Sequence, residues 1–118
     1  YHFETLDKVF GLSKSGIIRL FGPDYLIKGY PEKYSPFTYI DNLNLPIFIS
    51  TCKLDFLRAE PTALIKDLKD KHYKDMKVVD IDSDNKAVGH VHNVVNLNLK
   101  ESQEVNDAMR SFMEEYIK

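Results

Sequence analysis

The feature that most constrains the fold is an apolar run followed by an acidic turn, between Pro46 and Arg58. The run from Ile47 to Ile49 follows a proline and precedes polar residues, which is typical of a short strand buried on both faces of a parallel sheet. Asp55 comes a few residues later. In open α/β folds, residues just beyond the carboxyl ends of parallel strands build the functional site. Asp55 is therefore the first candidate site residue.

Length and composition set the outer limits of the fold. The chain has 118 residues, enough for one domain with a single core. Its 16 Lys+Arg and 18 Asp+Glu give a net charge of -2 without a basic block, so no nucleic-acid partner is expected. The apolar runs are far shorter than the ~20 residues of a membrane span, so none is predicted. A single cysteine, Cys52, excludes an internal disulfide and slightly favours a reducing compartment, the cytoplasm.

The order of elements from the central strand onward predicts an α/β chain. After the strand 47–49, a helix begins in the stretch 58–61, which has proline in its first turn. Residues 76–81 form a second strand, 89–93 a loop, and 101–117 a closing amphipathic helix whose apolar stripe core packing explains. Strands that alternate with helices predict a parallel sheet.

The first third of the chain differs in character. Residues 1–20 repeat apolar side chains at three- and four-residue steps, which predicts two short helices. Residues 21–39 combine proline and glycine turns with tyrosines, which predicts an irregular segment, either a lid or binding loop or a loop packed by its own aromatics. The tyrosines are Tyr25, Tyr30, Tyr34 and Tyr39. We therefore divide the chain into a helical and irregular segment, 1–34, and an α/β part, 35–118.

Asp55 and His90 each follow a predicted strand and stand 35 residues apart. A carboxylate that orients an imidazole is the acid and base half of a nucleophilic triad, in which the ring takes the proton of the nucleophile. The plainer interpretation is a helix N-cap for Asp55 and a solvated His90, since loop aspartates and histidines are common. Cys52 precedes Asp55 in the same turn and is predicted to be a buried structural thiol, because no basic partner is evident to lower its pKa.

Neither a metal nor a cofactor is expected. His90 and His92 could hold a metal together with a carboxylate such as Asp84, but no third ligand stands at a recognisable spacing. His2 and His72 are isolated from any partner at ligand spacing.

Four short motifs precede the closing helix in order. They are Ser35-Pro36-Phe37, Leu45-Pro46-Ile47-Phe48-Ile49, Leu54-Asp55-Phe56-Leu57-Arg58 and Gly89-His90-Val91. Together they resemble the C-terminal part of an α/β-hydrolase, and they are most similar to the esterase and lipase branch related to hormone-sensitive lipase. The resemblance covers about residues 35–118 and, more loosely, the cap-like segment before them. It implies a carboxylic ester hydrolase acting on a small-molecule ester, with Asp55 as triad acid and His90 as triad base.

His92 is the alternative to His90 as the base. The family often has a small residue and then an aromatic residue after its catalytic histidine, where this chain has Val91 and His92. Gly89 suits the tight turn just before His90, which favours His90.

The serine nucleophile is not recognisable in this sequence. The family places it in a Gly-x-Ser-x-Gly elbow. The stretch from Gly11 to Gly16 has Ser15 where the second glycine belongs, and we interpret it as a helix start. We therefore expect the nucleophile to lie upstream of Tyr1. The isolated chain is then expected to be inactive. Its open sheet is expected to pair with a missing N-terminal half of the same hydrolase or with a second copy. The alternative is a non-catalytic α/β module that recognises a partner through its Tyr-rich segment.

Overall fold

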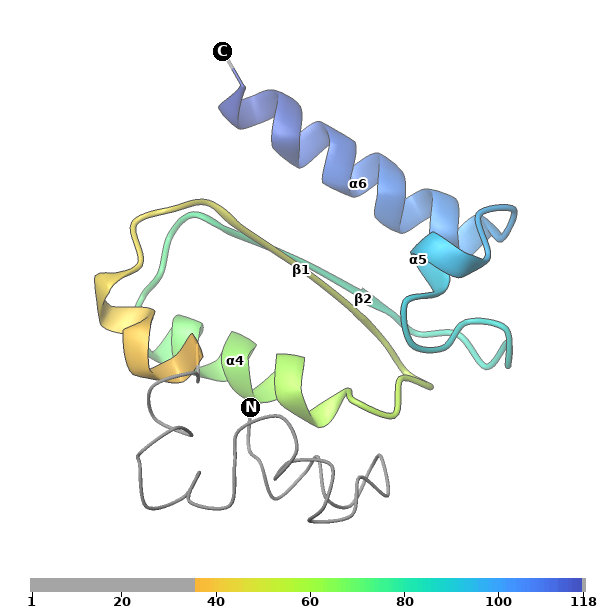
Figure 1. Cartoon of the computed structure of the whole chain (residues 1–118), viewed down its shortest axis with the longest axis horizontal. Helices are drawn as coiled ribbons and strands as arrows, with labels where there is room; N and C mark the ends of the chain where they lie inside the picture. The colour runs from red at the N-terminus through yellow and green to blue at the C-terminus, as the bar shows by residue number, and fades with distance from the viewer. Residues whose placement is uncertain (1–35, 118) are drawn as a thin grey trace, which may run out of the picture. The chain divides into compact units, whose positions relative to one another are not determined.

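The computed structural model describes residues 36–117 of the chain (Figure 1). The chain divides into two compact units, residues 1–43 and 44–118. In the first unit the described residues form a 3-10 helix, η1, Pro36–Asn42, so the end of the predicted irregular segment is helical. The helices predicted over 1–20 and most of the Tyr-rich segment lie outside the described residues, and the predicted boundary after residue 34 stays a prediction.

A parallel pair of strands forms the centre of the second unit. Strand β1, Ile47–Cys52, pairs with β2, Met76–Ile81, in a register that sets Cys52 opposite Ile81. The second strand and the parallel pairing were predicted and are confirmed. β1 runs three residues further than predicted, because the hydrogen-bonded ladder with β2 continues through the polar residues Ser50 and Thr51.

One helix packs on each face of this strand pair (Figure 1). Helix α4, Ala59–Asp70, connects the two strands and buries Leu68 completely. Helix α6, Lys100–Tyr116, lies on the other face, where the rings of Phe112 and Phe48 have centroids 5.6 Å apart. No helix in residues 36–117 has the length and apolarity that crossing a membrane requires. The predicted α/β class is confirmed, while the hydrolase relationship stays a prediction.

A buried cluster between the sheet and α6 includes a residue of the segment that follows β2 and so fixes the position of that segment. It contains Cys52, Ile81, Val88 and Val105, and Phe48, Val79 and Leu99 pack against it. Val88 is completely buried although it lies in a loop. The loop is therefore anchored in the core just before the residue pair Gly89-His90.

The predicted loop over 89–93 is wrong in its second half. His92–Val95 forms a one-turn helix, α5, which packs against α6. A single turn of helix has little stability of its own. Contacts with α6 hold it, and the sequence of the segment by itself carries no sign of them.

Candidate active site

Asp55 is held by the turn that follows β1. Its backbone N–H donates to the carbonyl of Cys52 over 3.2 Å, and its Oδ1 accepts from the N–H of Leu57 over 2.8 Å. This is the geometry of an Asx turn, in which the side chain bonds the backbone two residues on. Asp55 does not cap α4, whose N-cap residue is Arg58. The Asp55 side chain is only 11% exposed. Its own turn orients the carboxylate, through the hydrogen bond from the Leu57 N–H.

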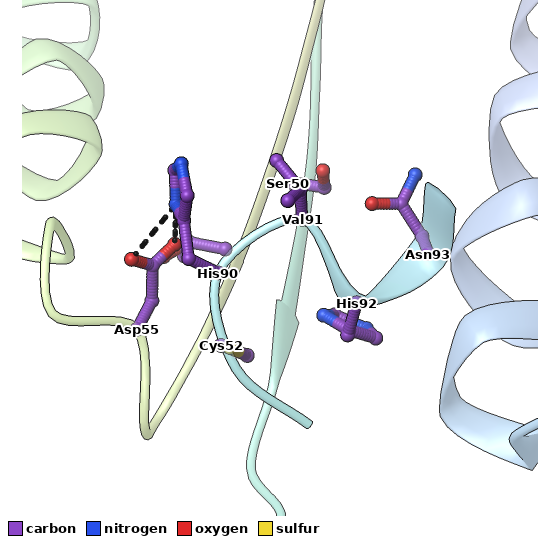
Figure 2. Close-up of a pocket in the computed structure, with 8 residues that line it drawn as sticks. Ser50, Cys52, Asp55, His90, Val91, His92 and Asn93 are labelled. Carbon is purple, nitrogen blue, oxygen red and sulfur yellow. Dashed lines mark hydrogen bonds and ion pairs between the residues drawn. The ribbon is translucent and has the colours of Figure 1, made fainter. Parts of the chain in front are cut away.

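The structure brings His90 onto this carboxylate (Figure 2). Nδ1 of His90 lies 3.1 Å from Oδ1 and 3.2 Å from Oδ2 of Asp55. The predicted contact between the two side chains is confirmed. Because an ionised carboxylate only accepts hydrogen bonds, Nδ1 carries the proton and Nε2 of the neutral ring keeps its lone pair. The His90 side chain is 38% exposed, so a reacting group can approach it.

Phe56 lies against the same imidazole, a contact that the sequence analysis missed. The ring centroids of Phe56 and His90 are 5.0 Å apart, with the planes tilted by 56°. The position of Phe56 directly after Asp55 could have indicated this contact, because a side chain next to a site carboxylate lies near the group that the carboxylate binds. The Phe56 ring restricts how the imidazole can turn.

His92 occupies a different environment from His90. Its side chain is buried, and its Nδ1 lies 3.1 Å from the carbonyl oxygen of Gly89. Since a carbonyl only accepts, this Nδ1 also carries the proton. The Nε2 of His92 is buried and has no hydrogen-bond partner among the described residues. The structure pairs Asp55 with His90 and leaves His92 in the interior.

A cavity of about 90 Å³ lies at the carboxyl end of β1, beside the Asp55–His90 pair (Figure 2). Its lining comes from the end of β1, the Asp55 turn and the His90 turn: Ser50, Thr51, Cys52, Asp55, His90, Val91, His92 and Asn93. This volume holds a few water-sized groups. Ser50 lines the cavity, but no hydrogen bond joins it to His90 in the described part of the chain.

Cys52 is a structural thiol, as predicted. Its side chain is buried, and Sγ lies 3.4 Å from the carbonyl oxygens of Val88 and Gly89. Burial, followed by the negative charge of Asp55, raises the pKa of the thiol above its ordinary value of 9.0. A protonated thiol is a poor nucleophile and serves here as a hydrogen-bond donor.

The remaining candidate ligands do not converge. Asp84 forms an ion pair with Lys53 at 2.7 Å and not with a histidine. His72 lies at the end of α4, with a positive φ of 56°. His2 lies outside the described residues. Within residues 36–117, no group of three or more His, Cys, Asp or Glu side chains is arranged to hold a metal ion.

Comparison of the chain with protein-family models, with curated proteins and with solved structures finds no match. The function is therefore argued from the geometry of the site.

Proposed function

We propose that this chain supplies the acid and the base of a Ser-His-Asp triad that hydrolyses carboxylic esters. The observation that carries the proposal is the contact of both Asp55 oxygens with Nδ1 of His90 at the carboxyl end of parallel strands. In this arrangement the carboxylate fixes the tautomer of the ring and stabilises the imidazolium. Nε2 of His90 takes the proton of the serine hydroxyl and later returns it to the leaving alcohol.

The charges around the site leave Asp55 available for this role. Arg58, the nearest arginine in sequence, donates to Asp80 over 2.7 Å. Asp55 keeps a carboxylate that is shielded from solvent and bonded to His90 and to one backbone N–H. A charge shielded from water acts more strongly on its neighbour than an exposed one.

The nucleophile is proposed to lie upstream of Tyr1, as the resemblance implies. Ser50 is the serine that lines the cavity, but it lies within β1, where no strained strand-to-helix turn presents its hydroxyl. Ser102 donates its hydroxyl proton to the carbonyl of His92. Substitution of Ser50 by alanine should therefore leave ester hydrolysis intact.

The test uses the protein as its gene encodes it, with p-nitrophenyl esters as substrates and a fluorophosphonate probe for an activated serine. His90→Asn should abolish turnover, and Asp55→Asn should lower kcat by about ten-thousand-fold, because the ring then prefers the wrong tautomer. His72→Asn and Asp107→Asn are matched controls at exposed positions outside the site, and both should retain the wild-type rate.

Three results would change the assignment. Loss of turnover in His92→Asn with full turnover in His90→Asn would make His92 the base. Loss of turnover and probe labelling in Ser50→Ala would make Ser50 the nucleophile. A wild-type protein that neither hydrolyses esters nor reacts with the probe would overturn the hydrolase proposal in favour of the binding module.

A further inference from the structure

The turn that carries His90 is held in a strained conformation. Val91, the next residue, has φ 51° and ψ 28°, in the left-handed region. A β-branched residue is a genuine outlier there, because its side chain crowds the backbone. Strain of this kind persists only where the surrounding structure over-determines it. Groups outside the turn must therefore hold it.

Cys52 binds the beginning of this turn. Its thiol faces the carbonyl oxygens of Val88 and Gly89, both at 3.4 Å, and its side chain is almost completely buried. The carbonyl of the same residue accepts the backbone N–H of Asp55. One residue is thus bonded to both halves of the acid–base pair, the Asp55 turn through its backbone and the His90 turn through its thiol.

Ser102 binds the end of the turn from α6. Its hydroxyl is fully buried and donates to the carbonyl oxygen of His92 over 3.0 Å. One helical turn further on, Asn106 donates to the carbonyl of Asn93 over 2.9 Å. Burying a serine hydroxyl is unfavourable unless it is bonded, so packing alone would be served as well by alanine. Ser102 and Asn106 of α6 thus both donate hydrogen bonds to backbone carbonyls at the end of the turn that carries His90, the histidine turn.

We infer that Cys52 and Ser102 are positioning residues that hold the turn 88–92 in its strained conformation and thereby keep Nδ1 of His90 on the Asp55 carboxylate. The inference rests on the proposed function, since it concerns the same acid–base pair. Neither side chain acts on a substrate. Their effect is geometric, and a displacement of about 1 Å in a catalytic group can cost on the order of a hundred-fold in rate.

The primary measurement is the proton NMR signal of the Asp55–His90 hydrogen bond in the protein as its gene encodes it. A proton shared between imidazole Nδ1 and a carboxylate resonates far downfield, and its loss in Asp55→Asn assigns it. Ser102→Ala should lose this signal. Ser111→Ala is the matched control: Ser111 is an exposed serine on the same helix whose hydroxyl donates to the carbonyl of Asp107, and this variant should keep the signal.

Cys52 is tested with a pair of variants. Cys52→Val has a similar volume but no donor and should lose the signal, whereas Cys52→Ser keeps a donor and should retain it. In the ester assay, Ser102→Ala and Cys52→Val should lower kcat and leave KM unchanged, because the thiol and the hydroxyl bond backbone carbonyls and so set the position of the base.

An unchanged signal in folded Ser102→Ala and Cys52→Val would overturn the inference. If Ser102→Ala does not fold, the pair Cys52→Val and Cys52→Ser decides by the same two outcomes, and Asn106→Ala removes the neighbouring, less buried bond from α6 to the carbonyl of Asn93. If only the proposed function is wrong, the result is different. The signal then responds to these substitutions as expected, but neither the wild-type protein nor any variant hydrolyses an ester.

Discussion

At the residue scale, the two histidines of the turn are distinguished by the acceptor that each Nδ1 meets. His90 meets the carboxylate of Asp55, and His92 meets the carbonyl of Gly89. Both contacts fix the same tautomer, but only the carboxylate carries a negative charge that stabilises a protonated ring. His90 also remains accessible, whereas His92 is buried. The difference favours His90 as the base.

Val91 gives the first prediction at this scale. An L-residue in the left-handed region costs ~1–2 kcal/mol, and Val91→Gly removes that cost. At Val94, inside α5, the same substitution instead lowers helix propensity. Both side chains are largely exposed, at 47% and 66%, so little burial is lost in either. In urea denaturation, the free energy of unfolding of Val91→Gly should exceed that of Val94→Gly by about 1–2 kcal/mol. Equal values would show that Val91 is unstrained.

Glu101 gives a prediction about acid stability. The pKa of Glu101, in the first turn of α6, is lowered from its ordinary value of 4.5 by its own backbone N–H and by the Ser83 hydroxyl at 2.8 Å. A carboxyl group with a lowered folded pKa stabilises the fold above its unfolded value and loses that contribution as the pH falls through the folded value. Glu101→Gln should therefore lose less stability than wild type below pH 4.5, measured by urea denaturation across an acidic pH series.

The control for this prediction is Glu104→Gln, at an exposed position on the same helix. It should follow the wild-type pH dependence. If Glu101→Gln and wild type have the same dependence, the hydrogen bond from Ser83 contributes nothing to acid stability.

At the scale of elements, α6 combines packing with positioning. Its beginning is buried at Ser102 and Val105, which face the histidine turn and the core. Towards its end, Met113 and Tyr116 are about half exposed, although their spacing from Val105 puts both on the apolar stripe of the predicted amphipathic helix. Core packing within the described residues therefore accounts for the first half of the stripe and only partly for the second.

Helix α4 gives the prediction at this scale. Leu68, on α4, is completely buried, whereas Leu97 is 60% exposed. Leu68→Ala should lower the free energy of unfolding by about 2–5 kcal/mol, through lost burial and the cavity left behind. Leu97→Ala should change it by no more than about 0.5 kcal/mol. Urea denaturation of the two variants measures the difference, and similar losses would mean that the burial of Leu68 does not stabilise the fold.

At the scale of the whole molecule, the sheet has fewer strands than parallel sheets usually have. The described residues contain two parallel strands, each paired on one side only. Parallel sheets are normally larger and covered on both faces. Apolar side chains also remain exposed on the second unit, among them Leu45, Val95 and Ile117. These two observations are the basis of our prediction that further chain of the same protein or a second copy covers the open sheet.

The 118-residue chain by itself is therefore expected to self-associate. Unpaired strand edges bind other edges, and the buried area gained is worth ~25 cal/mol per Å². Sedimentation velocity at micromolar concentration should show species larger than a monomer. A cooperatively folding monomer would contradict this expectation and favour the self-contained binding module.

Local patterns in the sequence determined the elements and the candidate site. The strand 76–81 and the helix that contains Pro61 near its start match the structure, because hydrophobic periodicity and proline placement act over a few residues. Asp55 and His90 were predicted because each follows a strand, and parallel strands end at the same edge of a sheet. Those predictions needed no knowledge of which side chains meet.

Tertiary structure alone decided the relations between distant residues. The extension of β1 to Cys52 depends on pairing with β2, and α5 depends on contacts with α6. Gly89 favoured His90 over His92 from the sequence, but the contact of His90 with Asp55 depends on where the strained turn points each ring. The roles of Cys52 and Ser102 arise from hydrogen bonds across 36 and 10 residues. No periodicity encodes such contacts, because they form only after helices and sheet have packed together.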